Sequence, residues 1–149
     1  MQRKDKQGWT IQKAKRILTD DVCNTKVEPY HCHDFSLVKL IVLGQWSNVY
    51  TTIIPKYFSA WRYVDLMAGS GTSYIKESDC TVAGSVFVAK AFAREPYSSY
   101  VLVEKNRERY KALNERAQGI GSPCQVHNED ANLVVDKIFG SQPEDTHSF

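Results

Sequence analysis

Several common signatures are missing from this sequence of 149 residues. Its four cysteines form no CxxC pair, which argues against a zinc knuckle or a thioredoxin-like site. No continuous apolar run approaches the roughly 20 residues that a membrane span needs. The first residues lack the apolar core of a secretory signal. The sequence therefore predicts a cytoplasmic protein with reduced thiols that makes no contact with a membrane.

Two further motifs are absent, one typical of NTP-binding proteins and one typical of serine hydrolases. No glycine-rich loop ends in GK[ST], which excludes an NTP-binding P-loop, and no G-x-S-x-G occurs, which leaves a serine hydrolase without support. The net charge of +2 argues neither for nor against nucleic acid. A composition of 42% hydrophobic and 24% charged residues is typical of one globular domain.

Residues 1–35 are predicted to be a basic and largely irregular segment. Six basic residues stand against Asp5 alone in its first half, namely Arg3, Lys4, Lys6, Lys13, Lys15 and Arg16. Such an arm can contact a nucleic-acid backbone, and a solvated tail or frayed helix is the alternative. His31, Cys32 and His33 suggest a metal site. Neighbouring side chains of an extended chain point to opposite faces, however, so we expect a loop before a helix.

Residues 36–149 are predicted to form an α/β domain that begins with a long helix over residues 36–54. Asp34 or Ser36 can cap this helix, and Pro55 ends it. Its apolar residues recur at three- and four-residue intervals, which indicates one core-facing stripe. The stripe comprises Leu37, Leu40, Ile41, Trp46, Val49, Tyr50 and Ile53.

Strand and helix patterns alternate after this helix. Strands are expected near 61–67, 99–104 and 124–128, because these segments are rich in branched and aromatic residues. The expected helices cover 84–93, 106–118 and 131–139. This alternation predicts a parallel sheet. Residues Thr72 to Val82 are polar and exceed what a simple loop between a strand and a helix needs. They are interpreted either as a flap over the ligand opening or as an ordinary surface loop.

Three predicted strand ends carry residues suited to a nucleoside. Asp65 closes the first strand before Ala68-Gly69-Ser70-Gly71, whose glycines let a ligand approach the backbone. Glu104 ends the second strand, where doubly wound folds bind the ribose hydroxyls. Asp130 and Ala131 follow the third, as an acceptor for an exocyclic amine and as room for a flat ring. Ligands of such sheets lie beyond the carboxyl ends of the strands, so the three loops predict one adenosine site.

This arrangement resembles the class I S-adenosylmethionine-dependent methyltransferases, with a doubly wound, Rossmann-like sheet. The matching pieces are Asp65-x-x-x-Gly69-x-Gly71, Glu104 and Asp130-Ala131. The resemblance implies S-adenosylmethionine as the cofactor. It also implies that the loop glycines lie near its methionine part, the glutamate at its ribose and Asp130-Ala131 beside its adenine.

A narrower resemblance is to the three-Cys-motif partner family, TcmP, over roughly residues 36–139. It rests on the long helix, on Tyr63-Val-Asp-Leu-Met-Ala-Gly-Ser-Gly71, on Ala83-Gly-Ser85 and on Val101-Leu-Val-Glu-Lys105. Met67 and Val86 stand where the family typically has phenylalanine and proline. The family's name implies a partner protein that carries three cysteines.

Catalysis in the methyltransferases commonly involves the end of a fourth strand, which we expect to begin near Glu144–Phe149. No Asp-Pro or Asn-Pro follows. The expectation is therefore the N-terminal half of a methyltransferase sheet, truncated or completed by a partner, that binds the donor and is incomplete for transfer. A nucleotide-binding or DNA-associated module without chemistry is the alternative, and an NAD-dependent dehydrogenase is a third interpretation.

Overall fold

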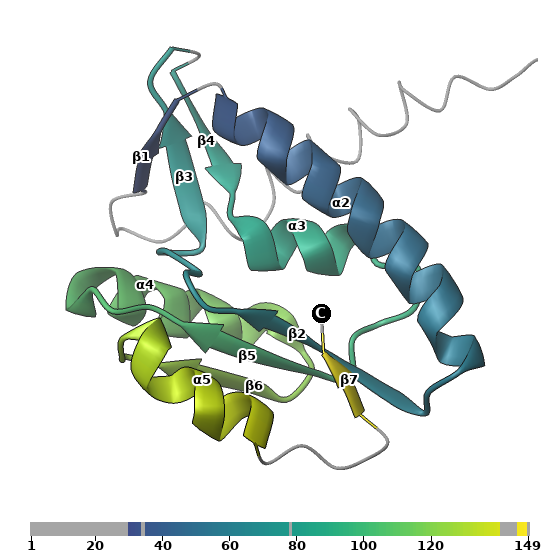
Figure 1. Cartoon of the computed structure of the whole chain (residues 1–149). Helices are drawn as coiled ribbons and strands as arrows, with labels where there is room; N and C mark the ends of the chain where they lie inside the picture. The colour runs from purple at the N-terminus through teal and green to yellow at the C-terminus, as the bar shows by residue number, and fades with distance from the viewer. Residues whose placement is uncertain (1–29, 34, 78, 141–145, 149) are drawn as a thin grey trace, which may run out of the picture.

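A computed structural model of the chain describes residues 30–33, 35–77, 79–140 and 146–148. The basic segment and its suggested contact with nucleic acid lie outside these residues, apart from the segment's last few positions. The described part is a mixed α/β structure with two small sheets (Figure 1). Its elements in chain order are β1 (Tyr30–Cys32), α2 (Phe35–Ile53), the 3-10 helix η2 (Ile54–Lys56), β2 (Ala60–Asp65), β3 (Thr72–Ile75), β4 (Cys80–Ala83), α3 (Ser85–Phe92), β5 (Ser99–Val103), α4 (Arg107–Ala117), η3 (Gln118–Ile120), β6 (Cys124–His127), α5 (Ala131–Gly140) and β7 (Thr146–Ser148).

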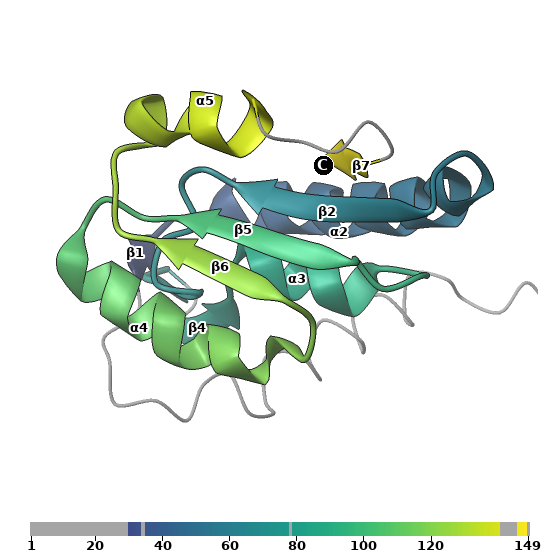
Figure 2. The same cartoon turned by 90° about the horizontal axis from the view of Figure 1, so that it is seen from below.

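The larger sheet is all parallel, with the strand order β6-β5-β2-β7. This confirms the three expected strands and the parallel sheet. The short β7 lies on the other side of β2 from β5, so the strand order reverses beside β2. A fourth strand is therefore present where the sequence suggested that one begins. Helix α5 covers one face of the sheet, and α3 and α4 cover the other (Figure 2).

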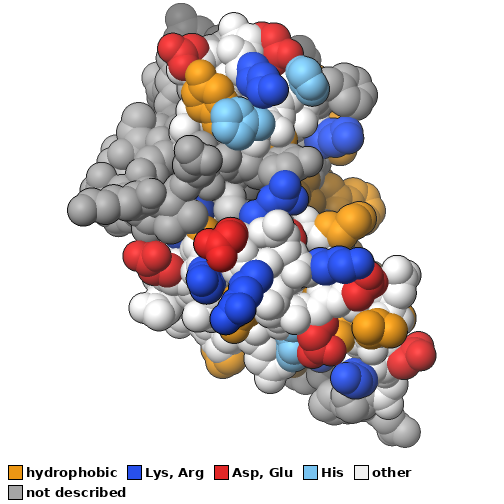
Figure 3. Space-filling model, turned by 90° about the vertical axis from the view of Figure 1, so that its left-hand side faces the viewer, with side chains coloured by type: hydrophobic (Ala, Val, Ile, Leu, Met, Phe, Trp, Pro, Cys, Tyr) orange, Lys and Arg blue, Asp and Glu red, His pale blue; other side chains and the backbone are white. Residues whose placement is uncertain are grey.

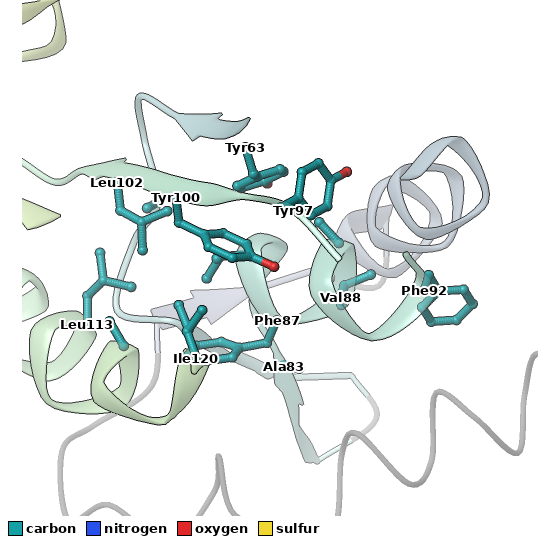
Figure 4. Close-up of a cluster of buried hydrophobic side chains, with 14 residues drawn as sticks. Tyr63, Ala83, Phe87, Val88, Phe92, Tyr97, Tyr100, Leu102, Leu113 and Ile120 are labelled. Carbon is teal, nitrogen blue, oxygen red and sulfur yellow. The ribbon is translucent and has the colours of Figure 1, made fainter. Parts of the chain in front are cut away.

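The core follows from the alternation of side chains along β5. Tyr100 and Leu102 point into a cluster with residues of α3 and α4, whereas Val101 and Val103 pack against α5. Figure 4 shows the first cluster between the sheet and the helices. Because both faces are covered, nearly every position of this strand is buried and apolar, as expected for the centre of a parallel sheet.

The second sheet, ordered β1-β3-β4, corrects two expectations. Strands β3 and β4 form an antiparallel hairpin in the region interpreted as a flap or a surface loop. Residues 30–32 pair in parallel with β3, so they form a strand instead of the expected loop. The strands are short, and the partner of residues 30–32 lies far away in the sequence, at residues 73–75, so the local pattern did not reveal this sheet.

Helix α2 ends at Ile53 and continues into a 3-10 turn that contains Pro55, close to the expected stop. The predicted core-facing stripe is wrong for four of its members, because about half of the side chain of each is exposed: Ile41, Trp46, Val49 and Ile53. The buried positions include Gly44, Ser47 and Thr51. A Cβ on Gly44 would lie 3.0 Å from the Phe92 ring, so small residues allow α2 to approach α3 closely.

The stretch Ser36–Lys56 is long and apolar enough to cross a membrane, with a mean hydropathy of 1.2 and 22% of it buried. The sequence analysis looked for a continuous apolar run, which Gln45, Ser47 and Asn48 interrupt, and so did not single out this stretch. Core helices of soluble proteins can be as long and as apolar, but they are mostly buried, whereas most of this stretch is exposed. Here Ser47 donates a hydrogen bond to the carbonyl of Ala89 at 2.7 Å, and Asn48 donates to that of Phe92 at 3.0 Å. These bonds attach α2 to α3.

Candidate functional site

A cavity of about 680 Å³ opens at the carboxyl ends of the parallel strands. Six of the seven residues expected to bind the cofactor line it, namely Ala68, Gly69, Gly71, Glu104, Asp130 and Ala131. They come from the loops after β2, β5 and β6. Parallel strands deliver their carboxyl ends to one edge, which explains how residues so distant in the sequence share one wall.

The glycine loop after β2 has the conformation that its sequence suggests. Gly69 and Gly71 have φ angles of 66° and 83°, a region that side chains disfavour. Gly71 packs closely, because a Cβ there would lie 2.9 Å from Cε2 of Phe87. No atom lies within 4 Å of a Cβ built on Gly69, so this position leaves the cavity open.

Further contacts hold this loop in place. The backbone N–H of Ala68 donates to the carbonyl of Val103 at 3.0 Å, which joins the loop to β5. The guanidinium of Arg116, a buried residue of α4, donates to the carbonyl of Ser70. The loop is therefore fixed by the sheet on one side and by a helix on the other.

Asp65 is the expected site residue that does not line the cavity. Its carboxylate accepts hydrogen bonds from the Met67 N–H at 3.1 Å, from the Tyr63 hydroxyl at 3.2 Å and from the Ser85 hydroxyl. Burial raises the pKa of Tyr63 well above its usual value, and the charge of Asp65 raises it further, so the phenol stays protonated and donates. Asp65 thus connects β2 to the first residue of α3, and its bond to the Met67 N–H fixes the start of the loop.

Glu104 is 8% exposed and lines the cavity. Its Oε1 accepts a hydrogen bond from the Asn106 N–H at 2.7 Å, which orients the carboxylate. Within the part of the chain that the structure describes, Oε2 has no hydrogen-bond partner. The arrangement therefore holds one oxygen of this carboxylate by a hydrogen bond and leaves the other without one.

Asp130 and Ala131 lie at the start of α5. Asp130 Oδ2 accepts from Lys105 Nζ at 2.8 Å, and Oδ1 accepts from the Asn132 N–H at 2.9 Å. The hydrogen bond from Lys105 lowers the pKa of Asp130 below its usual value. This carboxylate is therefore ionised at neutral pH. Both of its oxygens already accept hydrogen bonds from the protein, which the sequence did not suggest.

Sequence reasoning missed the opposite wall of the cavity. Four residues of α2 form part of it, namely Ser36, Lys39, Leu40 and Leu43, and the base of the hairpin contributes Thr72 and Ser73. The tip residues Lys76, Glu77 and Asp79 are exposed and do not line it. The flap interpretation therefore applies to the base of the insertion alone. The apolar pattern of a helix does not indicate that its residues line a cavity, because the elements that pack beside the helix come from distant parts of the sequence.

The metal interpretation of His31, Cys32 and His33 finds no support in the described residues, which contain no group of three or more candidate ligands. His33 Nδ1 instead lies 2.6 Å from Glu77 Oε1, and the His31 ring packs edge-on to Tyr74. Figure 3 shows that acidic and basic side chains are mixed on the described part of this side of the molecule. It presents no uniformly basic surface there of the kind that duplex DNA selects.

No protein-family model matches the chain, and no curated protein matches it.

Proposed function

We propose that the chain binds S-adenosylmethionine in this cavity and is a methyltransferase-like protein similar to the TcmP family. The observation that carries the proposal is the convergence of Gly69, Glu104 and Asp130 on one cavity from three neighbouring strands. The strand order β6-β5-β2-β7 supports a Rossmann-like sheet, since it is the order in which such sheets begin and then reverse.

The chemistry of Glu104 supports the ribose assignment. Its Oε2 can accept from a ribose hydroxyl while Oε1 remains bonded to the Asn106 N–H. A hydrogen bond to a charged acceptor contributes about 1.5–3 kcal/mol. Gly69 leaves space for the methionine part beside the loop, and Ala131 leaves space for a ring beside Asp130.

Calorimetric titration with S-adenosylmethionine tests the proposal. We expect Glu104→Gln to weaken binding at least tenfold, because about 1.4 kcal/mol corresponds to a factor of ten. Glu108→Gln is the matched control, since Glu108 is an exposed glutamate of α4 that does not line the cavity. Failure of the wild-type chain to bind would refute the proposal. Equal affinity of wild type and Glu104→Gln would refute the ribose assignment.

Titrations with other ligands separate the alternatives. A module that binds nucleotides without chemistry would prefer a nucleotide over S-adenosylmethionine, and an NAD-dependent dehydrogenase would prefer NAD. A DNA-associated module would bind duplex DNA with an affinity that falls steeply with salt. The proposal concerns donor binding. The family resemblance implies a partner protein with three cysteines but does not supply the methyl acceptor. A methyl-transfer assay with and without such a partner tests whether the chain transfers the methyl group.

A further inference from the structure

Thr72, at the base of the β3–β4 hairpin, has a buried hydroxyl that the protein does not use. The residue is 2% exposed and lines the cavity. Its backbone is held on both sides, because its carbonyl accepts from the Ser70 hydroxyl at 2.8 Å and it pairs with Ala83 across the hairpin. Its Oγ1, by contrast, has no hydrogen-bond partner within the part of the chain that the structure describes. A buried hydroxyl without a partner destabilises a folded protein, so a ligand that supplies the partner would explain it.

The charges that line the cavity are unevenly distributed. Its three acidic residues, Glu104, Glu129 and Asp130, all belong to the loops after β5 and β6. The opposite wall is formed by α2, the base of the hairpin and the start of α3, and among its described residues Lys39 alone carries a charge. An anionic group of a ligand is therefore repelled by the acidic loops and attracted by the opposite wall.

The other cations of the cavity are less suited to an anionic group. Lys105 donates to Asp130 at 2.8 Å, so its charge is already paired with a carboxylate. Arg109 lies near the start of α4 and shares the β5 side of the cavity with the buried glutamate. The start of α3 also lies beside a carboxylate, because the Ser85 hydroxyl donates to Asp65. These positions leave α2 and the base of the hairpin as the wall that favours an anion.

We propose that Lys39 and Thr72 bind the carboxylate at the amino-acid end of the ligand, an inference that rests on the proposed binding of S-adenosylmethionine. The order of the groups in this ligand agrees with the order of the residues along the cavity. With the ribose at Glu104, the methionine part extends past Gly69, and Thr72 follows directly after the glycine loop. Lys39 supplies a positive charge, and Thr72 supplies a hydroxyl donor, which bonds more strongly to a carboxylate than to a neutral group.

The Thr72 side chain can turn its hydroxyl toward the ligand without movement of the strand. Rotation about the Cα–Cβ bond exchanges the positions of the buried Oγ1 and the methyl group, and it leaves the backbone pairing of β3 intact. The hydrogen bond to the carboxylate then satisfies a polar group that is otherwise unpaired, which offsets the cost of the rotation. The hydroxyl thus lowers the stability of the chain by itself and raises its affinity for the ligand.

Calorimetric titration with S-adenosylmethionine and with decarboxylated S-adenosylmethionine tests the subsite, because the two ligands differ by the carboxylate alone. We expect the wild-type chain to bind S-adenosylmethionine at least tenfold more tightly. Lys39→Gln and Thr72→Val should each weaken the binding of S-adenosylmethionine about tenfold and should not weaken the binding of the decarboxylated ligand. Lys56→Gln is the matched control, since Lys56 is an exposed lysine that does not line the cavity.

Thermal unfolding without ligand separates this role of Thr72 from a structural one. Thr72→Val should not lower the midpoint temperature, since it removes a buried hydroxyl that has no partner in the described residues. Thr51→Val is the matched control, because the fully buried Thr51 lies outside the cavity and its hydroxyl donates to the Ser47 carbonyl and accepts from the Arg94 N–H, both at 2.8 Å. This variant should lower the midpoint and keep the preference for the carboxylate.

The outcomes distinguish the subsite from the proposed function. Equal affinity of the wild-type chain for the two ligands overturns the subsite, while the proposed function stands. A preference that both Lys39→Gln and Thr72→Val retain overturns the assignment to this wall. A Thr72→Val variant that loses as much stability as Thr51→Val also overturns it, because the hydroxyl would then have a structural partner. A chain that binds neither ligand refutes the proposed function and the subsite with it.

Discussion

The two glycines of the β2 loop should respond differently to the same substitution, although both have a positive φ angle. A Cβ on Gly71 would lie 2.9 Å from Phe87 Cε2 and 3.3 Å from Arg116 Cδ, both in buried residues. A Cβ on Gly69 would meet no atom within 4 Å. The comparison therefore separates backbone strain, which the two share, from packing, which differs.

The magnitudes follow from these two contributions. An alanine in the left-handed region costs about 1–2 kcal/mol, and an added methyl group in a packed core costs about 1–3 kcal/mol more. Alanine also restricts the unfolded chain, which offsets about 0.4–1 kcal/mol in both variants. We expect Gly71→Ala to lower the free energy of unfolding by about 2–4 kcal/mol and Gly69→Ala by about 1 kcal/mol.

Urea unfolding, followed by tryptophan fluorescence and circular dichroism, measures both values. Among the folded variants, Gly69→Ala should weaken the binding of S-adenosylmethionine more than Gly71→Ala does, since the methyl group at position 69 would extend into the cavity. Equal destabilisation by the two substitutions would refute the packing argument. Unchanged binding by Gly69→Ala would show that the ligand does not approach this glycine.

Two further substitutions test the α2–α3 contact and the Lys105 ion pair. Ser47→Ala removes a buried hydroxyl that donates to the Ala89 carbonyl of α3 at 2.7 Å, so the free energy of unfolding should fall by about 1–2 kcal/mol. The exposed Thr52→Ala should change it little, and similar losses in the two variants would contradict the contact. Lys105→Ala should raise the pKa of Asp130 toward its usual value in an NMR titration. Folding lowers the pKa of Asp130, so the ionised carboxylate stabilises the folded chain at pH values above the pKa that Asp130 has in the unfolded chain. This stabilisation is lost as the pH falls through the pKa of the folded chain. An Asp130 pKa that Lys105→Ala leaves unchanged would contradict the pairing.

The parallel sheet could be predicted because its signals are local. Strands β2 and β5 are rich in branched and aromatic residues, and the apolar pattern is continuous in β5 from Tyr100 to Val103, because both faces of the sheet are covered there. The cavity residues followed from the same reasoning, since the loops after parallel strands meet at one edge. Gly69, Glu104 and Asp130 could be assigned to one site without knowledge of side-chain packing.

The orientation of α2 could not be predicted in the same way. The helix has apolar residues around most of its circumference, so periodicity gives no unique buried face. The buried face is set by close approach to α3, which needs Gly44 against the Phe92 ring and hydroxyls that bond to α3 and its surroundings. Those contacts lie more than forty residues away in the sequence, and they select small polar residues over larger apolar ones.

The hairpin insertion leaves the glycine loop undisturbed for a geometric reason. It begins at Thr72 and ends at Ala83, which are paired across its base, so the chain returns to its starting point. There the Gly84 N–H donates to the Gly71 carbonyl at 2.7 Å, and a Cβ on Gly84 would lie 2.8 Å from that carbonyl. Helix α3 can therefore start beside the loop as it would after a short connection. Length and sequence at the exposed tip can then vary without moving the wall of the cavity.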